Sequence, residues 1–151
     1  MTDSSFKDIS WQDVCDCITQ IEHSLSVDQW KPDMIVGIAN GGVIPATLLS
    51  KRLSIPVRTA IVQLRDGSIQ ERNHDVEIAI RNGKNVLFVD DINDTGATLQ
   101  HIKDTWYIDE SCWGNNVRTA VLHTKFATRF GTDYQTYTFD SDTWVVYPWE
   151  V

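Results

Sequence analysis

Residues 86–98 constrain the fold and chemistry of this chain more than any other segment. The run begins with four apolar residues at 86–89, which are typical of a short strand buried on both faces in a parallel sheet. Two adjacent acids, Asp90 and Asp91, follow where that strand is expected to end, and Asp94 follows within one turn. The segment therefore predicts a buried strand that delivers three acids to its carboxyl end.

The next four residues, Thr95, Gly96, Ala97 and Thr98, are small and lead into a helix-like stretch. Backbone N–H groups at a helix start, together with two hydroxyls, form a cradle for a phosphate monoester. Acids beside such a cradle repel phosphate unless the ligand also carries hydroxyls or a divalent cation. Sugar hydroxyls, a phosphate and Mg²⁺ together describe phosphoribosyl pyrophosphate (PRPP). The alternative is a turn whose Asp, Asn and Gly residues serve only its backbone conformation.

The composition is that of a globular protein. The chain has 151 residues, 42% of them apolar and 23% charged, so we expect a single domain over residues 1–151. No segment approaches the apolar length of a membrane span, and the N-terminus lacks the features of a signal peptide, so we expect a cytoplasmic location. Cys15, Cys17 and Cys112 have no metal-like spacing and are expected to be reduced thiols.

The net charge of −8 limits the possible partners. A surface this acidic repels nucleic-acid phosphate, so we expect neither RNA nor DNA as the main partner. It also repels a polyanionic substrate. Local hydrogen-bond donors and a metal ion must therefore offset the overall field at any phosphate site.

Strand-like and helix-like patterns alternate along the chain. Ser10 is placed to cap a first helix that ends near residue 23 and buries Val14, Ile18 and Ile21. The polar segment 65–75 shows no periodicity and is expected to be a functional loop. The expected strands are 34–38, 57–64, 86–89, 117–123 and 134–139, and the expected helices between them are 43–53 and 99–106. This order predicts an α/β fold, a doubly wound and mostly parallel sheet with flanking helices and ligands at the carboxyl ends of the strands.

The acids and threonines of residues 90–98 are spaced as in the type I phosphoribosyltransferases, which this chain resembles. A Gly-Gly loop after the expected strand 34–38, and the run Asp-Thr-Trp-Val-Val-Tyr-Pro-Trp at 142–149, extend the resemblance to bacterial xanthine–guanine members. It covers about residues 11–150. It implies the phosphoribosyltransferase fold with a small C-terminal purine-binding hood, assembled as a homodimer or homotetramer.

The resemblance gives each residue of the signature a role. Asp90 and Asp91 would bind the ribose hydroxyls directly or through Mg²⁺, with Asp91 as the metal ligand. Asp94 would be the general base that takes a proton from the purine as its nitrogen attacks C1 of the ribose. A helix N-cap is the simpler role for Asp94. Residues 95–98 would bind the 5′-phosphate.

Asn40, Gly41 and Gly42 occupy the place of the family's pyrophosphate loop. The relatives carry an arginine where this chain has Asn40, and a neutral amide replaces a charged fork. Pyrophosphate would then depend on the N–H groups of Gly41 and Gly42, on Mg²⁺ and on a cation from elsewhere. Arg72 is the first candidate for that cation and Arg65 the second, and a solvated loop charge is the alternative for either.

The purine side of the resemblance rests on Lys125, Trp144 and Val145. The lysine would donate to the purine 6-oxo group, which favours an oxygen acceptor over the amino group of adenine. Trp144 would stack on the base, and the Val145 carbonyl would meet its 2-position. An ordinary surface lysine and a core tryptophan are the alternatives, and Trp106 and Trp113 are expected in the core.

Together these expectations describe a Mg²⁺-dependent enzyme of purine salvage. It would join a 6-oxopurine to PRPP and release pyrophosphate with GMP, XMP or IMP. One alternative is a non-catalytic regulator of the same fold that senses PRPP or a nucleotide. Another is a receiver-like phosphoacceptor domain, but this explains neither residues 95–98 nor the C-terminal run.

Overall fold

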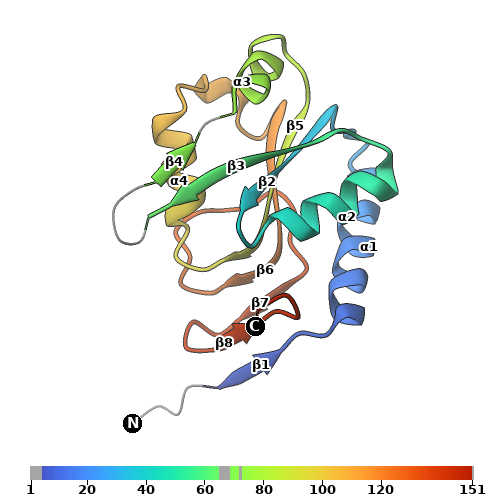
Figure 1. The fold of residues 1–151 in the computed structure, drawn as a ribbon, viewed down its shortest axis with the longest axis vertical. Helices are drawn as coiled ribbons and strands as arrows, with labels where there is room; N and C mark the ends of the chain where they lie inside the picture. The colour runs from blue at the N-terminus through green and yellow to red at the C-terminus, as the bar shows by residue number, and fades with distance from the viewer. Residues whose placement is uncertain (1–4, 65–68, 72, 151) are drawn as a thin grey trace.

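A central sheet organises the computed structural model, which describes residues 5–64, 69–71 and 73–150. Within these residues the sheet has six strands in the order β4-β3-β2-β5-β6-β7 (Figure 1). The bounds are β2 Met34–Ala39, β3 Val57–Gln63, β4 Ile69–Glu71, β5 Val86–Asn93, β6 Val117–Lys125 and β7 Tyr137–Phe139. β4 runs antiparallel to β3 at one edge, and the other neighbouring pairs are parallel. The expected doubly wound, mostly parallel sheet is confirmed.

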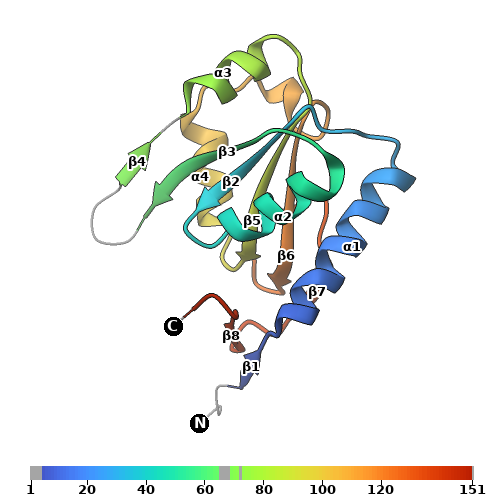
Figure 2. The ribbon, with the colours of Figure 1, turned by 45° about the vertical axis from the view of Figure 1, so that its right-hand side comes forward.

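Helices cover both faces of this sheet (Figure 2). The helices α1 Trp11–Val27 and α2 Val43–Leu53 bury their apolar side chains with one set of strand residues, which includes Ile35 and Leu87. The helices α3 His74–Arg81 and α4 Ala97–Thr105 pack with the opposite set, which includes Val36 and Phe88. Adjacent strand residues therefore belong to different cores, as expected for a sheet covered on both faces.

α1 begins at the expected position but runs further than its sequence pattern predicts. The Ser10 hydroxyl accepts from the Asp13 N–H at 3.0 Å, and the Asp13 carboxylate accepts from the Ser10 N–H at 2.9 Å, so a complete capping box starts the helix. The helix continues to Val27 because Leu25 is buried in the core, and the Ser24 hydroxyl donates to the Gln20 carbonyl without breaking the turn. The expected end near residue 23 is wrong.

Other boundaries also differ from expectation. β5 continues through Asn93, so the acid pair belongs to the strand, and α4 begins at residue 97 instead of 99. The segment 65–75 is not wholly a loop, since it contains β4 and the start of α3, which the Asn73 side chain caps. Of the expected strand 134–139, only Tyr137–Phe139 forms a ladder, and Tyr134 makes a single bridge to Ala120.

A second, two-stranded sheet lies beyond the carboxyl ends of β5 and β6 (Figures 1 and 2). It pairs β1 Phe6–Asp8 in parallel with β8 Trp144–Val146, and neither strand is evident from sequence periodicity. Ser5 and the C-terminal segment 142–150 are thereby held together over the sheet edge. We refer to β1 and residues 142–150 as the hood.

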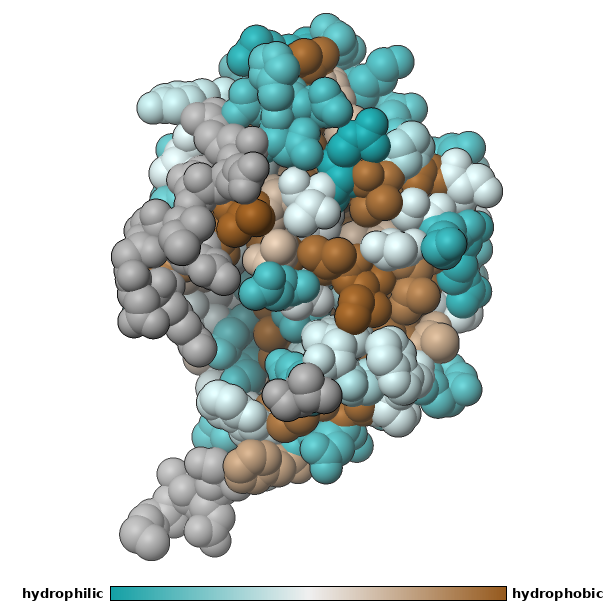
Figure 3. All heavy atoms as spheres, in the orientation of Figure 1, coloured by the Kyte–Doolittle hydropathy of each residue, from teal (hydrophilic) through white to brown (hydrophobic). Residues whose placement is uncertain are grey.

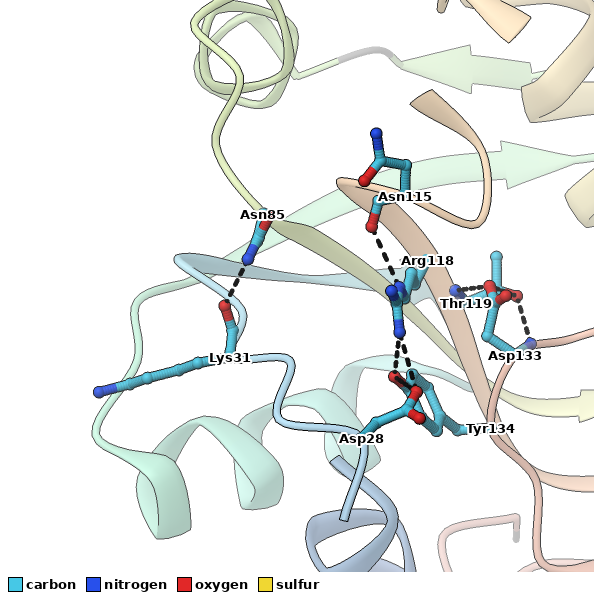
Figure 4. A network of polar contacts seen from close by, with 8 residues as sticks. All are labelled: Asp28, Lys31, Asn85, Asn115, Arg118, Thr119, Asp133 and Tyr134. Carbon is cyan, nitrogen blue, oxygen red and sulfur yellow. Dashed lines mark hydrogen bonds and ion pairs between the residues drawn. The ribbon is translucent and has the colours of Figure 1, made fainter. Parts of the chain in front are cut away.

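At the opposite end of the sheet, Arg118 ties several segments together (Figure 4). Its Nη1 donates to the Asp28 carboxylate at 2.9 Å and to the Tyr134 hydroxyl at 2.8 Å, and its guanidinium lies 4.8 Å from the centroid of the Trp30 ring. The Tyr134 hydroxyl donates to Asp28 at 2.7 Å. This network stabilises the amino end of β6 and takes no part in the candidate site.

The surface is mostly polar. In the view of Figure 3, apolar residues gather in the middle of one face, where Figure 1 places α2 and β3, with polar residues around them. No helix in the described ranges is both long and apolar enough to cross a bilayer. Cys15, Cys17 and Cys112 are free thiols, as expected.

Candidate active site

The carboxyl ends of β2, β5 and β6 bring the predicted residues together. Residues 90–99 line a cavity of about 240 Å³ at this edge. The 40–42 loop follows β2, the acids end β5, and Lys125 ends β6. Because β2, β5 and β6 are parallel neighbours, segments far apart in the chain meet at one edge.

The acid pair is fixed by short local hydrogen bonds. The Asp91 N–H donates to Asp90 Oδ1 at 2.8 Å, and the Ile92 N–H donates to Asp91 Oδ1 at 2.7 Å. Burial raises the pKa of the Asp90 carboxyl well above its usual range, and the neighbouring charge of Asp91 raises it further. Burial also raises the pKa of Asp91. Ionising both of these adjacent carboxyls is costly in the protein alone. Binding of a cation, or hydrogen bonds donated by a diol, would stabilise their charged form.

The donor set of this pair suits Mg²⁺. Carboxylate oxygens are the hard ligands that this ion prefers, and it is usually held by one or two carboxylates plus substrate oxygens. In the part of the chain that the structure describes, no group of three His, Cys, Asp or Glu side chains is arranged to hold a metal alone. The residues therefore fit an ion that shares its coordination with a bound phosphate compound.

The 40–42 loop packs directly on the end of β5. A Cβ atom on Gly41 would lie 2.2 Å from Asp91 Oδ2, and one on Gly42 would lie 2.3 Å from the Val89 carbonyl oxygen. Only glycine fits at either position. The Gly42 N–H donates to the Ile38 carbonyl at 2.8 Å, so without a ligand this N–H is engaged within the protein. Asn40 is exposed beside this loop.

The 95–98 loop has the geometry of a helix start. Gly96 is the N-cap of α4 with φ of +90°, a conformation that favours glycine. A Cβ there would also lie 2.7 Å from the Cβ of Phe130. The Thr95 hydroxyl accepts from the Ala97 N–H at 3.2 Å. The alternative role of Asp94 as the N-cap is wrong, because Gly96 holds that position.

Asp94 instead faces Lys125. The lysine Nζ lies 3.4 Å from Asp94 Oδ1, and the two side chains are 9% and 57% exposed. Lys125 is therefore not an ordinary surface lysine. A half-exposed carboxylate and a largely buried ammonium meet at the edge of the cavity, where both can also contact a ligand.

The hood presents an exposed aromatic ring and free peptide groups. The Trp144 N–H donates to the Ser5 carbonyl at 2.7 Å, and the Ile9 N–H donates to the Val146 carbonyl at 2.8 Å. Since alternate residues of a strand face the same neighbour, the peptide groups of Val145 face away from β1. Trp144 is 58% exposed and is not a core residue.

Trp106 and Trp113 pack in the apolar core, as expected. Their rings lie 5.5 Å and 6.3 Å from the Phe88 ring, measured between centroids. Arg72 and Arg65, the two candidates for a pyrophosphate cation, lie outside the described residues.

Residues 128–130 support the site and are not evident from sequence motifs. The Asn93 side-chain amide donates to the Phe130 carbonyl at 2.7 Å, and Asn93 Oδ1 accepts from the Thr128 hydroxyl at 3.0 Å. The Arg129 N–H donates to the Thr95 carbonyl at 3.0 Å, and Arg129 is exposed. The sequence signals for this support are weak: a polar residue, Asn93, at the end of an apolar strand, and a basic residue, Arg129, four positions after Lys125.

A parallel sheet with an acid pair, a helix-start loop and a C-terminal hood defines the type I phosphoribosyltransferase class. The family model described as "Phosphoribosyl transferase domain" matches residues 8–151, and the chain belongs to this family. The expected relationship is confirmed.

Solved structures extend this result. The chain is similar to a purine phosphoribosyltransferase from Pyrococcus horikoshii, with 29% identity, a TM-score of 0.74, and coverage of 97% of this chain and 95% of that one. A hypothetical protein from Neisseria gonorrhoeae with bound ppGpp has 25% identity, a TM-score of 0.77, and coverage of 100% and 92%. The xanthine-guanine-hypoxanthine phosphoribosyltransferase of Helicobacter pylori shares the fold at 19% identity, with a TM-score of 0.69 and coverage of 97% and 94%.

Proposed function

We propose that this protein is a Mg²⁺-dependent phosphoribosyltransferase that joins a 6-oxopurine to PRPP. The observation that carries the proposal is the 3.4 Å approach of Lys125 to Asp94. Asp94 belongs to the PRPP signature, and Lys125 belongs to the purine side of the family pattern. Their meeting at one cavity edge supports a site that holds both substrates at once.

The PRPP half of the proposal uses β5 and the start of α4. Asp90 and Asp91 accept hydrogen bonds from the ribose hydroxyls, and the N–H groups and hydroxyls of residues 95–98 bind the 5′-phosphate. Asp91 and substrate oxygens would hold Mg²⁺, which would supply positive charge to offset that of the pyrophosphate. The 40–42 loop lies beside the acid pair and faces the same ligand.

A cation is still needed because Asn40 replaces the family arginine. Arg129 is a candidate cation for the 5′-phosphate end, since its backbone bonds to Thr95 and its side chain is exposed. Arg72 or Arg65 would serve the pyrophosphate end. A guanidinium is suited to this task because it donates to phosphate oxygens in pairs.

The purine half of the proposal uses Lys125 and the hood. Lys125 donates to the 6-oxo oxygen, Trp144 stacks on the ring, and the Val145 carbonyl accepts from a donor near the 2-position. In the reaction a purine nitrogen bonds to C1 of the ribose, and the bond from C1 to the pyrophosphate oxygen breaks with its electron pair. Asp94 accepts the proton that the purine loses.

The direct test is product formation with Mg²⁺, PRPP and one of four bases. We expect guanine, xanthine or hypoxanthine to give nucleotide and pyrophosphate, and adenine to give neither. Product from adenine alone would contradict the role of Lys125. Absence of product from every base would contradict the enzymatic function.

A nucleotide-sensing regulator of the same fold is the second candidate. Two observations favour it: the neutral Asn40 in the 40–42 loop, and the ppGpp held by the Neisseria relative. The same assay separates the two functions when it is combined with calorimetry. A regulator binds PRPP or a guanine nucleotide without forming product, whereas an enzyme does both.

A further inference from the structure

We propose that Tyr147 and His123 are positioning residues. Through a chain of hydrogen bonds they fix the main chain of Asp91, and they connect the hood to the acids that would bind PRPP. This inference rests on the proposed function, because it assigns a purpose to the position of Asp91. Neither residue lines the cavity of residues 90–99. Tyr147 is buried, and His123 lines a separate cavity of about 570 Å³ together with Cys17 and Thr136.

A chain of hydrogen bonds joins these residues to the site. The Tyr147 hydroxyl lies 3.1 Å from the main-chain carbonyl oxygen of Asp91, and His123 Nδ1 lies 2.8 Å from the same hydroxyl. Tyr147 is 2% exposed and His123 4% exposed. At this degree of burial, water competes little for these polar groups, so the hydrogen bonds fix the positions of the groups that they join.

The direction of each hydrogen bond follows from its partners. A carbonyl oxygen only accepts, so the single Tyr147 proton is donated to Asp91. His123 must then donate from Nδ1, which makes Nε2 the unprotonated nitrogen of a neutral ring. Nε2 faces the buried Cys17 Sγ at 3.6 Å. Burial lowers the pKa of His123 to about 4, which agrees with a neutral ring.

Asp91 needs this support because the sheet holds β5 on only one side here, where the ladder with β6 continues to the pair of Asn93 with Thr124. The ladder between β2 and β5 ends at the pair of Gly37 with Val89, two residues before Asp91. The buried Asp90 carboxyl lies next to it, and Gly41 packs so closely on its carboxylate that a Cβ there would lie 2.2 Å from Asp91 Oδ2. The Tyr147 hydroxyl anchors the Asp91 carbonyl beyond the last pair with β2, so the backbone that carries the carboxylate keeps one position.

Tyr147 also belongs to the hood, only three residues after Trp144. Its ring is stacked on Trp149, with centroids 4.8 Å apart and planes 3° apart, and on His123 at 5.7 Å. Its N–H donates to the Glu150 carboxylate at 3.2 Å. A displacement of the hood by a purine on Trp144 is therefore transmitted to the residue that binds ribose or metal.

The test is Tyr147→Phe, which keeps the ring and removes the hydroxyl. We expect a rise of about 3- to 10-fold in the KM for PRPP, because one buried hydrogen bond is lost. The matched control is Tyr134→Phe. It also removes a buried tyrosine hydroxyl, from the Arg118 and Asp28 network at the other end of the sheet, and should leave that KM unchanged.

Hydrogen exchange supplies a readout that does not depend on activity. The Ile92 amide, which donates to Asp91 Oδ1, should exchange faster in Tyr147→Phe than in wild type and be unchanged in Tyr134→Phe. Unchanged exchange at Ile92 in Tyr147→Phe would overturn the inference, whether or not the enzyme is active. If the wild-type protein forms no nucleotide but Ile92 still exchanges faster in Tyr147→Phe, the proposed function is overturned and the positioning role remains supported.

A pair of substitutions tests His123 in the same way. His123→Gln keeps an N–H donor for the Tyr147 hydroxyl, whereas His123→Leu removes it. We expect the glutamine variant to retain a KM for PRPP within about twofold of wild type and the leucine variant to match Tyr147→Phe. Equal KM values in both variants would show that His123 only fills space.

Discussion

At the scale of single residues, Asp94 is the residue whose chemistry decides the proposal. Its carboxylate is half-exposed and 3.4 Å from Lys125 Nζ, so it contributes little to folding and is free to meet a substrate. Asp94→Asn should therefore lower kcat by about 10²- to 10⁴-fold, the usual contribution of a general base. Initial rates of GMP formation measure the effect. Turnover equal to wild type would remove Asp94 from the catalytic step.

Unlike Asp94, Asp90 is expected to lower the stability of the fold while it supports PRPP binding. Burial and the charge of Asp91 raise its pKa, so its ionised form is costly in the protein without ligand. Asp90→Asn should raise the free energy of unfolding by on the order of 1 kcal/mol at pH 7, because the amide removes the repulsion and still accepts from the Asp91 N–H. The same change should weaken PRPP binding. Urea unfolding without ligand and calorimetry with PRPP give the two values, and a less stable variant would contradict the argument.

At the scale of elements, most of the sheet could be predicted from local sequence patterns, whereas the hood was implied only by the family resemblance. The long strands β5 and β6 and helix α2 have apolar runs or periodic faces, and their residues form the two cores. β1 and β8 have only three residues each, and their pairing joins residue 6 to residue 144. Such a contact depends on tertiary structure, which no local pattern records.

The candidate site shows the same division. Asp90, Asp91 and residues 95–98 are neighbours in sequence, so one motif was enough to place them together. Lys125 and Trp144 required a family resemblance. Tyr147 and His123 act on Asp91 from behind, and neither their spacing nor their residue type marks a site.

The start of α4 offers a prediction for an element. Gly96→Ala should destabilise the protein by about 1–3 kcal/mol, because φ is +90° and the new Cβ would lie 2.7 Å from the Phe130 Cβ. The 95–98 loop must then shift, so the KM for PRPP should also rise. Gly83→Ala is the control: φ there is +74°, but no atom lies within 4 Å of the new Cβ. An effect on KM at both glycines would assign the change to backbone strain alone.

At the scale of the whole molecule, the free energy of unfolding should depend on pH through a buried histidine and two buried carboxyls, whose contributions change in opposite directions. Burial lowers the pKa of His123 from 6.5 to about 4, so between these values the unfolded chain binds a proton that the folded chain does not. This contribution to the free energy of unfolding is complete above pH 6.5 and is lost as the pH falls towards 4. Asp90 and Asp91 have raised pKa values, so their contribution increases as the pH falls.

The two contributions can be separated with a variant that lacks the imidazole. His123 alone should cost up to about 3 kcal/mol of unfolding free energy between pH 7 and pH 4, from a shift of about 2.5 pKa units at 1.36 kcal/mol each. The glutamine of His123→Gln does not titrate in this range, so the stability difference between wild type and variant should shrink steadily as the pH falls from 7 to 4. Urea unfolding at half-unit steps of pH gives the curve for each protein. Parallel curves would show that His123 does not titrate in this interval, and the pH dependence would then belong to the carboxylates at the end of β5.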